Sequence, residues 1–336
     1  SDPWAGRVYY VEGSRVWSFA EMTSGPQTPV QLTNMPFAYP EAMAVFTGFG
    51  GADELFFARS EYDPDRTLIE QFRVSNNAFV SPLLNGPTGY QDGPLASARA
   101  TWIPSMFGLP SRGELYFLDG LSSVRRVRPA DSSPALVTVA GARENREPVD
   151  GPRAVARVAF PIGLAIDEQR AFVSGFTQED ATIRALDLVT GEMSLFAGVR
   201  GASVQNPVDG VRGVGTLGIA SDLVVVDGTL YLTDMFGAAI RTVDLATGEI
   251  RTVAGQLGNP GSTNGTGAAA RFRFFAQQQG GLGGGLATDG TSLFVADTGN
   301  FAIRRVNLST MQVTTLAGGT EGSVDGIGDQ ARFLTP

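Results

Sequence analysis

The chain has 336 residues, 43% of them hydrophobic, with 43 glycines and 19 prolines. This composition suits a large core joined by many turns and favours short strands. The sequence has no cysteine, histidine or lysine, so all 25 basic residues are arginine. Thiol, imidazole and Schiff-base catalysis, disulfides and zinc sites built on Cys or His are therefore excluded. The net charge of −9 disfavours nucleic acid, and no apolar run is long enough for a membrane-spanning helix.

One pattern occurs six times along the chain. Each copy has an apolar triplet with an aromatic residue, followed about ten residues later by a β-branched residue and often arginine. The aromatic residues of successive copies lie 47 to 63 positions apart, as in repeat architectures. In chain order the copies are Val8-Tyr9-Tyr10 with Val16, Leu55-Phe56-Phe57 with Ile69, Leu115-Tyr116-Phe117 with Val124-Arg125, Ala171-Phe172-Val173 with Ile183-Arg184, Leu230-Tyr231-Leu232 with Ile240-Arg241, and Leu293-Phe294-Val295 with Ile303-Arg304.

Each copy contains signals for four strands. A smaller apolar strand such as Leu223–Val226 comes before the triplet, and a strand such as Arg251–Gly255 closes the copy after a turn at Asp244–Gly248. A lone antiparallel sheet leaves its faces exposed, which favours sheets stacked around an axis over a linear solenoid. We therefore predict an all-β, six-bladed β-propeller of four-stranded antiparallel blades. It forms one domain over residues 1–336, with blades at roughly 4–35, 38–85, 104–141, 160–198, 219–255 and 284–318.

The first copy differs from the others at its start. Gly6–Tyr9 leads directly into the second-strand position, while Leu334–Pro336 stands where an inner strand is expected to begin. We expect either that a longer parent chain continues and completes the first blade with a C-terminal strand, or that this blade lacks its inner strand.

The second half resembles the NHL-repeat family. The resemblance rests on Val253–Gly255, Asn264–Phe272, Leu293–Asn300 and Ile303–Val306, recurs at Asp325–Phe333, and is looser at Asp150–Arg157 and Asp92–Arg99. Asp209-Gly210 lacks the following Ala-Arg, the first two copies keep little of the signature, and Asn300-Phe301 replaces the family's Asn-His. The resemblance implies a propeller. NHL-like amidating lyases hold zinc with histidine, which this chain lacks.

The connectors between copies carry an acid and an arginine about seven residues apart. Arginine pairs well with carboxylates and Asp-Gly favours a turn, so we predict that these residues hold one blade to its neighbour rather than bind a ligand. The residues are Asp92, Arg99, Asp150, Arg157, Arg271, Asp325 and Arg332. We also expect Asp234 and Asp297 to accept backbone N–H groups in turns.

Asp167, Asp227 and Asp289 each follow an inner strand. In a ring they would gather at one mouth of the axial channel, where their carboxylates could bind a ligand or calcium. Capping of turns accounts for the three residues equally well, and no other cofactor is predicted.

Two further motifs favour structural interpretations. Gly213–Gly218 has the G-x-G-x-x-G form, but a strand follows it instead of the helix that a dinucleotide site needs. The basic run Arg125–Arg128 is split between two faces by strand alternation, so nucleic acid is not a predicted partner.

The sequence therefore favours a non-catalytic scaffold, exported from the cell, that presents a propeller face to a protein or glycan partner. The alternative is a metal-assisted carboxylate hydrolase or lyase at the axial mouth. A cation held by several side chains would favour the enzyme, and an exposed apolar patch would favour the scaffold.

Overall fold

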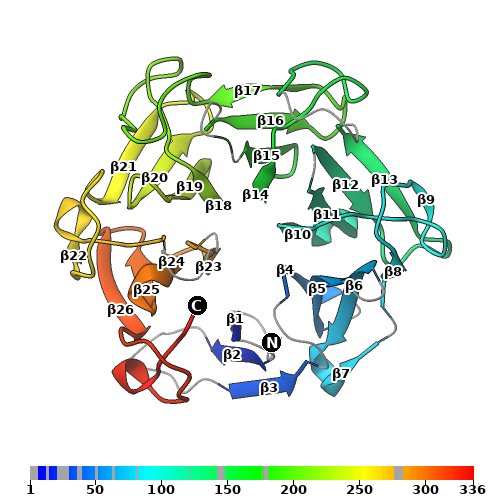
Figure 1. Cartoon of the computed structure of the whole chain (residues 1–336), viewed down its shortest axis with the longest axis horizontal. Coiled ribbons are helices and arrows are strands. Elements are labelled where there is room, and N and C mark those ends of the chain that lie inside the picture. The colour runs from blue at the N-terminus through cyan, green and yellow to red at the C-terminus, as the bar shows by residue number, and fades with distance from the viewer. Residues whose placement is uncertain are drawn as a thin grey trace. The chain divides into compact units, whose positions relative to one another are not determined.

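The computed structural model describes residues 7–12, 15–20, 30–35, 40–49, 52–62, 65–80, 82–120, 122–141, 148–175, 177, 181–275 and 283–336. Its strands form six antiparallel sheets (Figure 1). Short 3₁₀ turns make up the helical structure in this part of the chain: η1 (Val74–Asn76), η2 (Pro110–Arg112), η3 (Gly267–Ala269), η4 (Thr298–Asn300) and η5 (Gly328–Gln330). Over the same residues, no helix has the length and apolar character needed to cross a membrane.

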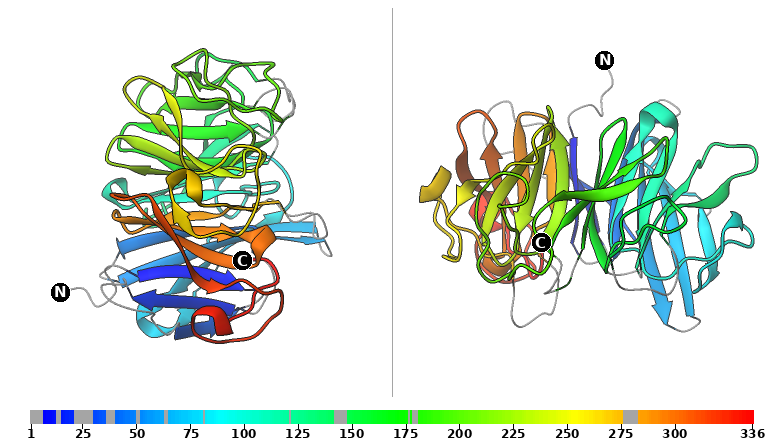
Figure 2. Two further views of the ribbon diagram at one scale, coloured as in Figure 1. Left: turned by 90° about the vertical axis from the view of Figure 1, so that its left-hand side faces the viewer. Right: turned by 90° about the horizontal axis from the view of Figure 1, so that it is seen from above.

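Five sheets contain four or five strands, and in each the main strands of one repeat pair in chain order, while a short extra strand joins three of the sheets out of this order. Figure 2 shows this for the sheet of residues 220–255, whose yellow-green to yellow strands lie side by side. The strands of the first two such sheets are β4 (Ala42–Phe49), β5 (Ala52–Tyr62), β6 (Asp65–Arg73), β7 (Ala78–Phe79) and β8 (Leu84–Pro87), then β9 (Gly93–Pro94), β10 (Met106–Leu109), β11 (Glu114–Asp119), β12 (Ser123–Val127) and β13 (Ala135–Ala140).

The remaining three sheets follow the same order. They comprise β14 (Pro161–Ile166), β15 (Arg170–Gly175), β16 (Ile183–Asp187) and β17 (Met193–Ala197); β18 (Ala220–Val226), β19 (Thr229–Asp234), β20 (Ala239–Asp244) and β21 (Ile250–Gly255); and β22 (Gly265–Thr266), β23 (Leu286–Thr288), β24 (Ser292–Asp297), β25 (Ala302–Asn307) and β26 (Gln312–Gly318).

Over the described residues, the prediction of six blades was wrong, and of the two alternatives for the first copy the described strands fit the one that lacks an inner strand. The structure has five blades of at least four strands, while the first copy forms a three-stranded sheet of β1 (Arg7–Glu12), β2 (Arg15–Ala20) and β3 (Val30–Asn34). The physical reason is that β1 occupies the place of a second strand. Within the residues that the structure describes, this sheet therefore has no inner strand.

Aspartate or asparagine closes the hairpin between the third and fourth strands of three blades. Asp244 Oδ1 accepts the N–H groups of Ala246 and Thr247 at 3.0 and 2.7 Å, and Gly248 follows with φ +74°. Asp187 and Asn307 do the same in the β16–β17 and β25–β26 hairpins. The predicted hairpin turn at Asp244–Gly248 is confirmed.

The connectors between blades cover the outer edges of the sheets. β9 pairs with β13 and β22 pairs with β26, while single bridges join Gly151 to Met193 and Gly210 to Ile250. An exposed sheet edge is a template for aggregation, so this pairing protects the outer strands of four blades.

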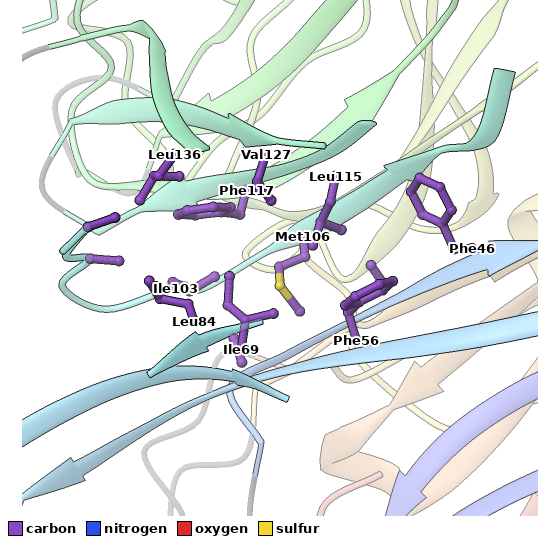
Figure 3. Packing of buried hydrophobic residues seen from close by; sticks show 14 residues of the cluster. Phe46, Phe56, Ile69, Leu84, Ile103, Met106, Leu115, Phe117, Val127 and Leu136 are labelled. Carbon is purple, nitrogen blue, oxygen red and sulfur yellow. The ribbon is translucent and has the colours of Figure 1, made fainter. Parts of the chain in front are cut away.

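The chain divides into two compact units, one made mainly of Leu32–Val173 and the other mainly of Leu195–Pro336. In the first unit, apolar residues of β4–β8 pack against those of β10–β13. Phe46, Phe56, Met106, Leu115 and Phe117 are among the residues of this core (Figure 3). At Gly108 a Cβ atom would lie 2.6 Å from the carbonyl oxygen of Val45, so a larger residue there would force β10 away from β4.

In the second unit, hydroxyl groups link second strands to the chain that follows. Ser174 Oγ donates to the carbonyl of Ala220 at 2.7 Å, and Thr233 Oγ1 donates to that of Gly284 at 2.6 Å. Both bonds are buried. These bonds tie one blade to the inner strand region of the next.

Candidate functional site

The third strands of four blades carry a fully buried arginine, and the arginines of three of them, Arg125, Arg241 and Arg304, share one set of contacts. Arg125, Arg241 and Arg304 are at most 1% exposed. Each donates to a buried aspartate that ends the second strand of the same blade, at 2.7, 3.0 and 2.6 Å respectively. The aspartates are Asp119, Asp234 and Asp297. We call each such arginine with its acid partners an arginine clamp.

The other end of each guanidinium binds the connector that precedes the blade. In the first clamp, Arg125 donates to Asp92 at 2.7 Å and to the carbonyls of Gln91 and Arg99. The same pattern recurs with Asp209 and the carbonyls of Val208 and Thr216 around Arg241, and with Asn264 and the carbonyls of Thr263 and Arg271 around Arg304. Because arginine is a planar multiple donor, one side chain can satisfy both strand and connector.

The connector acids and arginines were predicted to hold one blade to its neighbour, and this role stays a prediction; the structure does show the partners of two of the acids. Asp92 and Asp150 do bind arginine, but their partners are the third-strand residues Arg125 and Arg184, at 2.7 and 3.0 Å. The reason is that the buried guanidinium needs acceptors from outside its own blade. Arg99 supplies its backbone carbonyl instead of its side chain.

The other predicted connector residues have different contacts. The Arg271 side chain donates to the carbonyls of Ala268 and Ala270 and to the Gln256 side chain, while its own carbonyl accepts from Arg304. Backbone bridges pair Arg157 with Val149 and Arg332 with Val324. Asp325 adjoins the second of these bridges.

The sheet β4–β8 contains a clamp with the charges exchanged. In the strand register, Glu70 pairs with Phe57 as Arg125 pairs with Phe117. Arg59, two residues after Phe57, donates to Glu70 at 3.0 Å and also contacts Glu61. The sequence pattern did not reveal this pair.

The structure places the three inner-strand acids in turns. Asp167 Oδ1 accepts the N–H groups of Gln169 and Arg170 at 2.8 and 2.6 Å, and Asp289 Oδ1 accepts those of Thr291 and Ser292 at 2.8 and 2.7 Å. Asp227 is exposed with φ 45°. Across the described ranges, no group of three acidic side chains could hold a metal ion. Binding of a ligand by these residues stays a prediction.

Asp234 accepts a backbone N–H in a turn, as predicted, whereas the backbone N–H that Asp297 accepts comes from the preceding connector. Asp234 accepts from Gly237 and Gly218 at 2.8 and 3.0 Å, and Asp297 accepts from Arg273 at 2.7 Å. Their larger role, as clamp partners, was not predicted. The signal was present in the sequence, because each acid lies seven residues before the clamp arginine of its blade.

A fourth inner-strand acid, Asp222, was missed. Its Oδ2 accepts the N–H of Leu286 on β23 at 2.8 Å, and its Oδ1 accepts the N–H of Leu223 at 2.9 Å. Burial raises the pKa of Asp222 to about 6, since these two hydrogen bonds only partly offset the loss of water. Its unusual environment makes it a candidate functional group.

One connector exposes a group of apolar side chains. Val208, Val211 and Val214 are 48%, 59% and 59% exposed, and we call residues 208–216 the valine turn. Hydrogen bonds cross the turn from Thr216 N to Val208 O at 2.9 Å and from Gly215 N to Val211 O at 3.0 Å. The G-x-G-x-x-G motif begins in this turn and leads into the strand β18, as the sequence indicated.

Contacts with β21 and β17 also fix the position of the valine turn. Gly210 forms a bridge with Ile250 on β21, and the guanidinium of Arg212 lies 5.0 Å from the ring centre of Phe196 on β17. Gly248 permits this arrangement, because a Cβ there would lie 2.5 Å from Arg212 Nε. The backbone that carries the three valines is therefore fixed by hydrogen bonds and side-chain contacts.

The geometry defines an all-β β-propeller of four-stranded antiparallel blades, and solved structures share this fold. A chain in a structure described as a nidogen/laminin complex is 8% identical with a TM-score of 0.60, over 97% of this chain and 95% of that chain. A Bacteroides thetaiotaomicron protein of unknown function is 12% identical with a TM-score of 0.58, over 98% and 76%. TolB from Acinetobacter baumannii is 10% identical with a TM-score of 0.53, over 98% and 66%. Such identities show the fold alone.

The sequence comparisons are more limited. Protein SUPPRESSOR OF QUENCHING 1, chloroplastic, from Arabidopsis thaliana is 34% identical over 163 residues, which cover 45% of this chain and 14% of that protein. The match thus spans about one seventh of the length of the curated relative. No family model matches the chain, so membership of the NHL family stays a prediction.

Proposed function

We propose that this chain is a non-catalytic binding scaffold that docks a protein partner on the valine turn. The observation that carries the proposal is the exposure of Val208, Val211 and Val214 on one anchored loop. Apolar side chains that are rigidly held in water lose little conformational entropy on binding, and clustered exposed apolar groups are typical of interaction sites.

The charged residues of the blades support a scaffold over an enzyme. The clamp arginines and their acids are engaged with one another and with connector carbonyls. Asp167 and Asp289 accept backbone N–H groups in turns. The metal-assisted carboxylate hydrolase or lyase stays the alternative, and no contact among the described residues favours it.

The expected partner has an apolar contact surface with a basic surround. The chain carries a net charge of −9, which attracts a cationic partner over long range, while the valines supply the short-range contact. A glycan partner would instead need an exposed aromatic ring. Trp102, 39% exposed in the connector before β10, is the candidate for that role.

The test begins with a photo-crosslinking amino acid at position 211, used to identify a neighbour in an extract of the native organism. The captured protein is then purified and its Kd measured by calorimetry. We expect Val211→Asp to weaken binding at least tenfold, because a charge in an apolar contact is desolvated without a partner.

Val189→Asp is the matched control, since Val189 is 81% exposed on the β16–β17 hairpin turn. It is expected to change the Kd less than twofold. Equal affinities for Val211→Asp and wild type would overturn the proposed docking site. Binding on a glycan array that Trp102→Ala abolishes and Val211→Asp does not would assign a glycan partner.

Export from the cell is part of the proposal, because a scaffold for external partners must reach them. Fractionation of the native organism tests it. If the protein were recovered only in the cytosol, the proposal of export would be wrong, while the proposed docking site on the valine turn would be unaffected.

A further inference from the structure

A polar junction joins the inner strands β18 and β23 within the second compact unit. Asp222 on β18 accepts the N–H of Leu286 on β23 at 2.8 Å. Beside it, Thr233 on β19 donates to the carbonyl of Gly284 at 2.6 Å and lies 3.0 Å from Ser221 Oγ. Two side chains from one blade thus hold the beginning of the next blade's inner strand.

The strand pairing explains why Leu286 needs an acceptor. Ala296 on β24 donates to the carbonyl of Gly285, and Leu286 pairs with Val295. In an antiparallel ladder, hydrogen-bonded and non-hydrogen-bonded pairs alternate, so the N–H of Leu286 points away from β24. Without Asp222, this edge N–H would lose its protein partner.

The backbone at the junction is fitted closely. Gly284 has φ +96°, and a Cβ atom there would lie 2.8 Å from Ser221 Oγ and 3.0 Å from Thr233 Oγ1. A residue other than glycine would therefore separate the two strands. The close approach of β18 and β19 to the start of β23 thus requires glycine at position 284.

The junction contains no cation to neutralise Asp222 among the described residues. β23 has no titratable side chain, and Asp289 beyond its end caps a turn. On β19, Asp234 is paired with Arg241 at 3.0 Å, and on β24, Asp297 is paired with Arg304 at 2.6 Å. The other groups on the packed strands are Tyr231 on β19 and the exposed Asp227 after β18.

We propose that Asp222 is a proton-dependent latch, which holds β18 and β23 together when it is neutral and weakens their junction when it is ionised. A neutral carboxyl still has an acceptor oxygen for the N–H of Leu286. An ionised carboxyl in the same partly buried place has no counter-charge among the described residues, which is costly.

The direction of the pKa agrees with this geometry. Burial raises the pKa of Asp222 to about 6, above its value in an unfolded chain. The folded state therefore binds this proton more tightly, so the stabilisation is present at low pH and is lost as pH rises through about 6. The latch would be closed in an acidic compartment and weakened at neutral pH.

Hydrogen exchange of the whole chain tests the latch. Backbone exchange is measured for peptides spanning β18 and β23 at pH 5.0 and 7.5, with correction for intrinsic rates. For wild type we expect the opening constant of the Leu286 segment to rise about tenfold between these pH values, since one pKa unit corresponds to a factor of ten. Asp222→Asn, which is neutral at both pH values, is expected to show no such rise.

Two further variants separate the latch from general destabilisation. Thr233→Val removes the neighbouring bridge, so we expect faster exchange at both pH values with the same pH dependence. Asp289→Asn changes a turn acid just after β23, on the other side of the junction, and should leave the pH dependence of the junction unaltered. If Asp222→Asn does not fold, the wild-type profile decides: a midpoint near pH 6 supports the latch, and a flat profile or a midpoint near pH 4 overturns it.

Discussion

The sheets β9–β13 and β4–β8 each join their second and third strands by an ion pair, but the positions of the acid and the arginine are exchanged between them. In the first, the second strand ends in Asp119 and the third carries Arg125; in the second, the second strand carries Arg59 and the third Glu70. Both arrangements give a buried or nearly buried ion pair at the same place in the sheet. In the first sheet, Arg125 also reaches the connector and donates to the carbonyl of Arg99, which a carboxylate at that position could not do. A carboxylate on the third strand, such as Glu70, cannot bind connector carbonyls in the way that Arg125 does.

The largest expected effect comes from removing a clamp arginine. Arg241→Met leaves Asp234, which is fully buried, without its cation and leaves two connector carbonyls without a donor. Loss of one partner from a buried pair costs about 3–5 kcal/mol. Unfolding in urea would measure this loss. Arg251→Met is the control, since Arg251 is 68% exposed, and a comparable loss there would contradict the assigned role of the clamp.

Reversing the exchanged pair sharpens the comparison. Glu70→Arg puts two cations side by side in β4–β8, and we expect a loss of about 2 kcal/mol. The double variant Arg59→Glu with Glu70→Arg restores an ion pair in the polarity of Asp119 and Arg125. It should recover at least half of that loss in a double-mutant cycle, with the rest reflecting the contact between position 59 and Glu61. Strictly additive effects would show that the pair contributes nothing.

The repeated strands could be predicted because their signals are local, whereas the clamps depend on register and burial. Arg125 and Arg126 are neighbours in one motif, yet Arg125 is fully buried and the Arg126 side chain is 27% exposed. Because blades bury both faces, alternation along the strand did not identify the buried residue. Arg59 and Glu70 are 11 residues apart, whereas Asp119 and Arg125 are six apart, since the β5–β6 hairpin is longer.

The candidate sites show the same limit. The turn acids were predicted from their place after inner strands, but Asp222 lies within a strand, and its partner Leu286 belongs to the neighbouring blade. The valine turn was recognised as a glycine motif. The regular spacing of Val208, Val211 and Val214 between polar residues was the available signal for an exposed apolar surface.

A smaller effect is expected at the connector end of a clamp. Arg304 donates to Asn264 at 2.9 Å, where the other two clamps have an aspartate. Asn264→Asp would supply the missing charge to a buried guanidinium, and we expect stabilisation of about 0.5 to 1 kcal/mol, because the site is solvent-exposed. Thermal unfolding would detect it as a raised Tm. An unchanged or lowered Tm would show that the carbonyls of Thr263 and Arg271 already satisfy Arg304.

The smallest effect separates the clamp acids from Asp222 by the sign of their pH dependence. Burial alone would raise the pKa of Asp209, but hydrogen bonds from Thr252 and Arg241 outweigh it and hold the pKa below its usual value. Asp209 therefore stabilises the folded state above about pH 4, and this contribution is lost as pH falls through the folded pKa. Since Asp209 is 46% exposed, the change is at most about 0.5 kcal/mol.

Urea unfolding of wild type and Asp209→Asn between pH 7 and 3 measures this change in the free energy of unfolding. The stability difference should shrink only below about pH 4, whereas the pH-dependent contribution of Asp222 is lost as pH rises through about 6. Profiles of the same sign for both acids would contradict the distinction between a paired connector acid and an unpaired inner-strand acid.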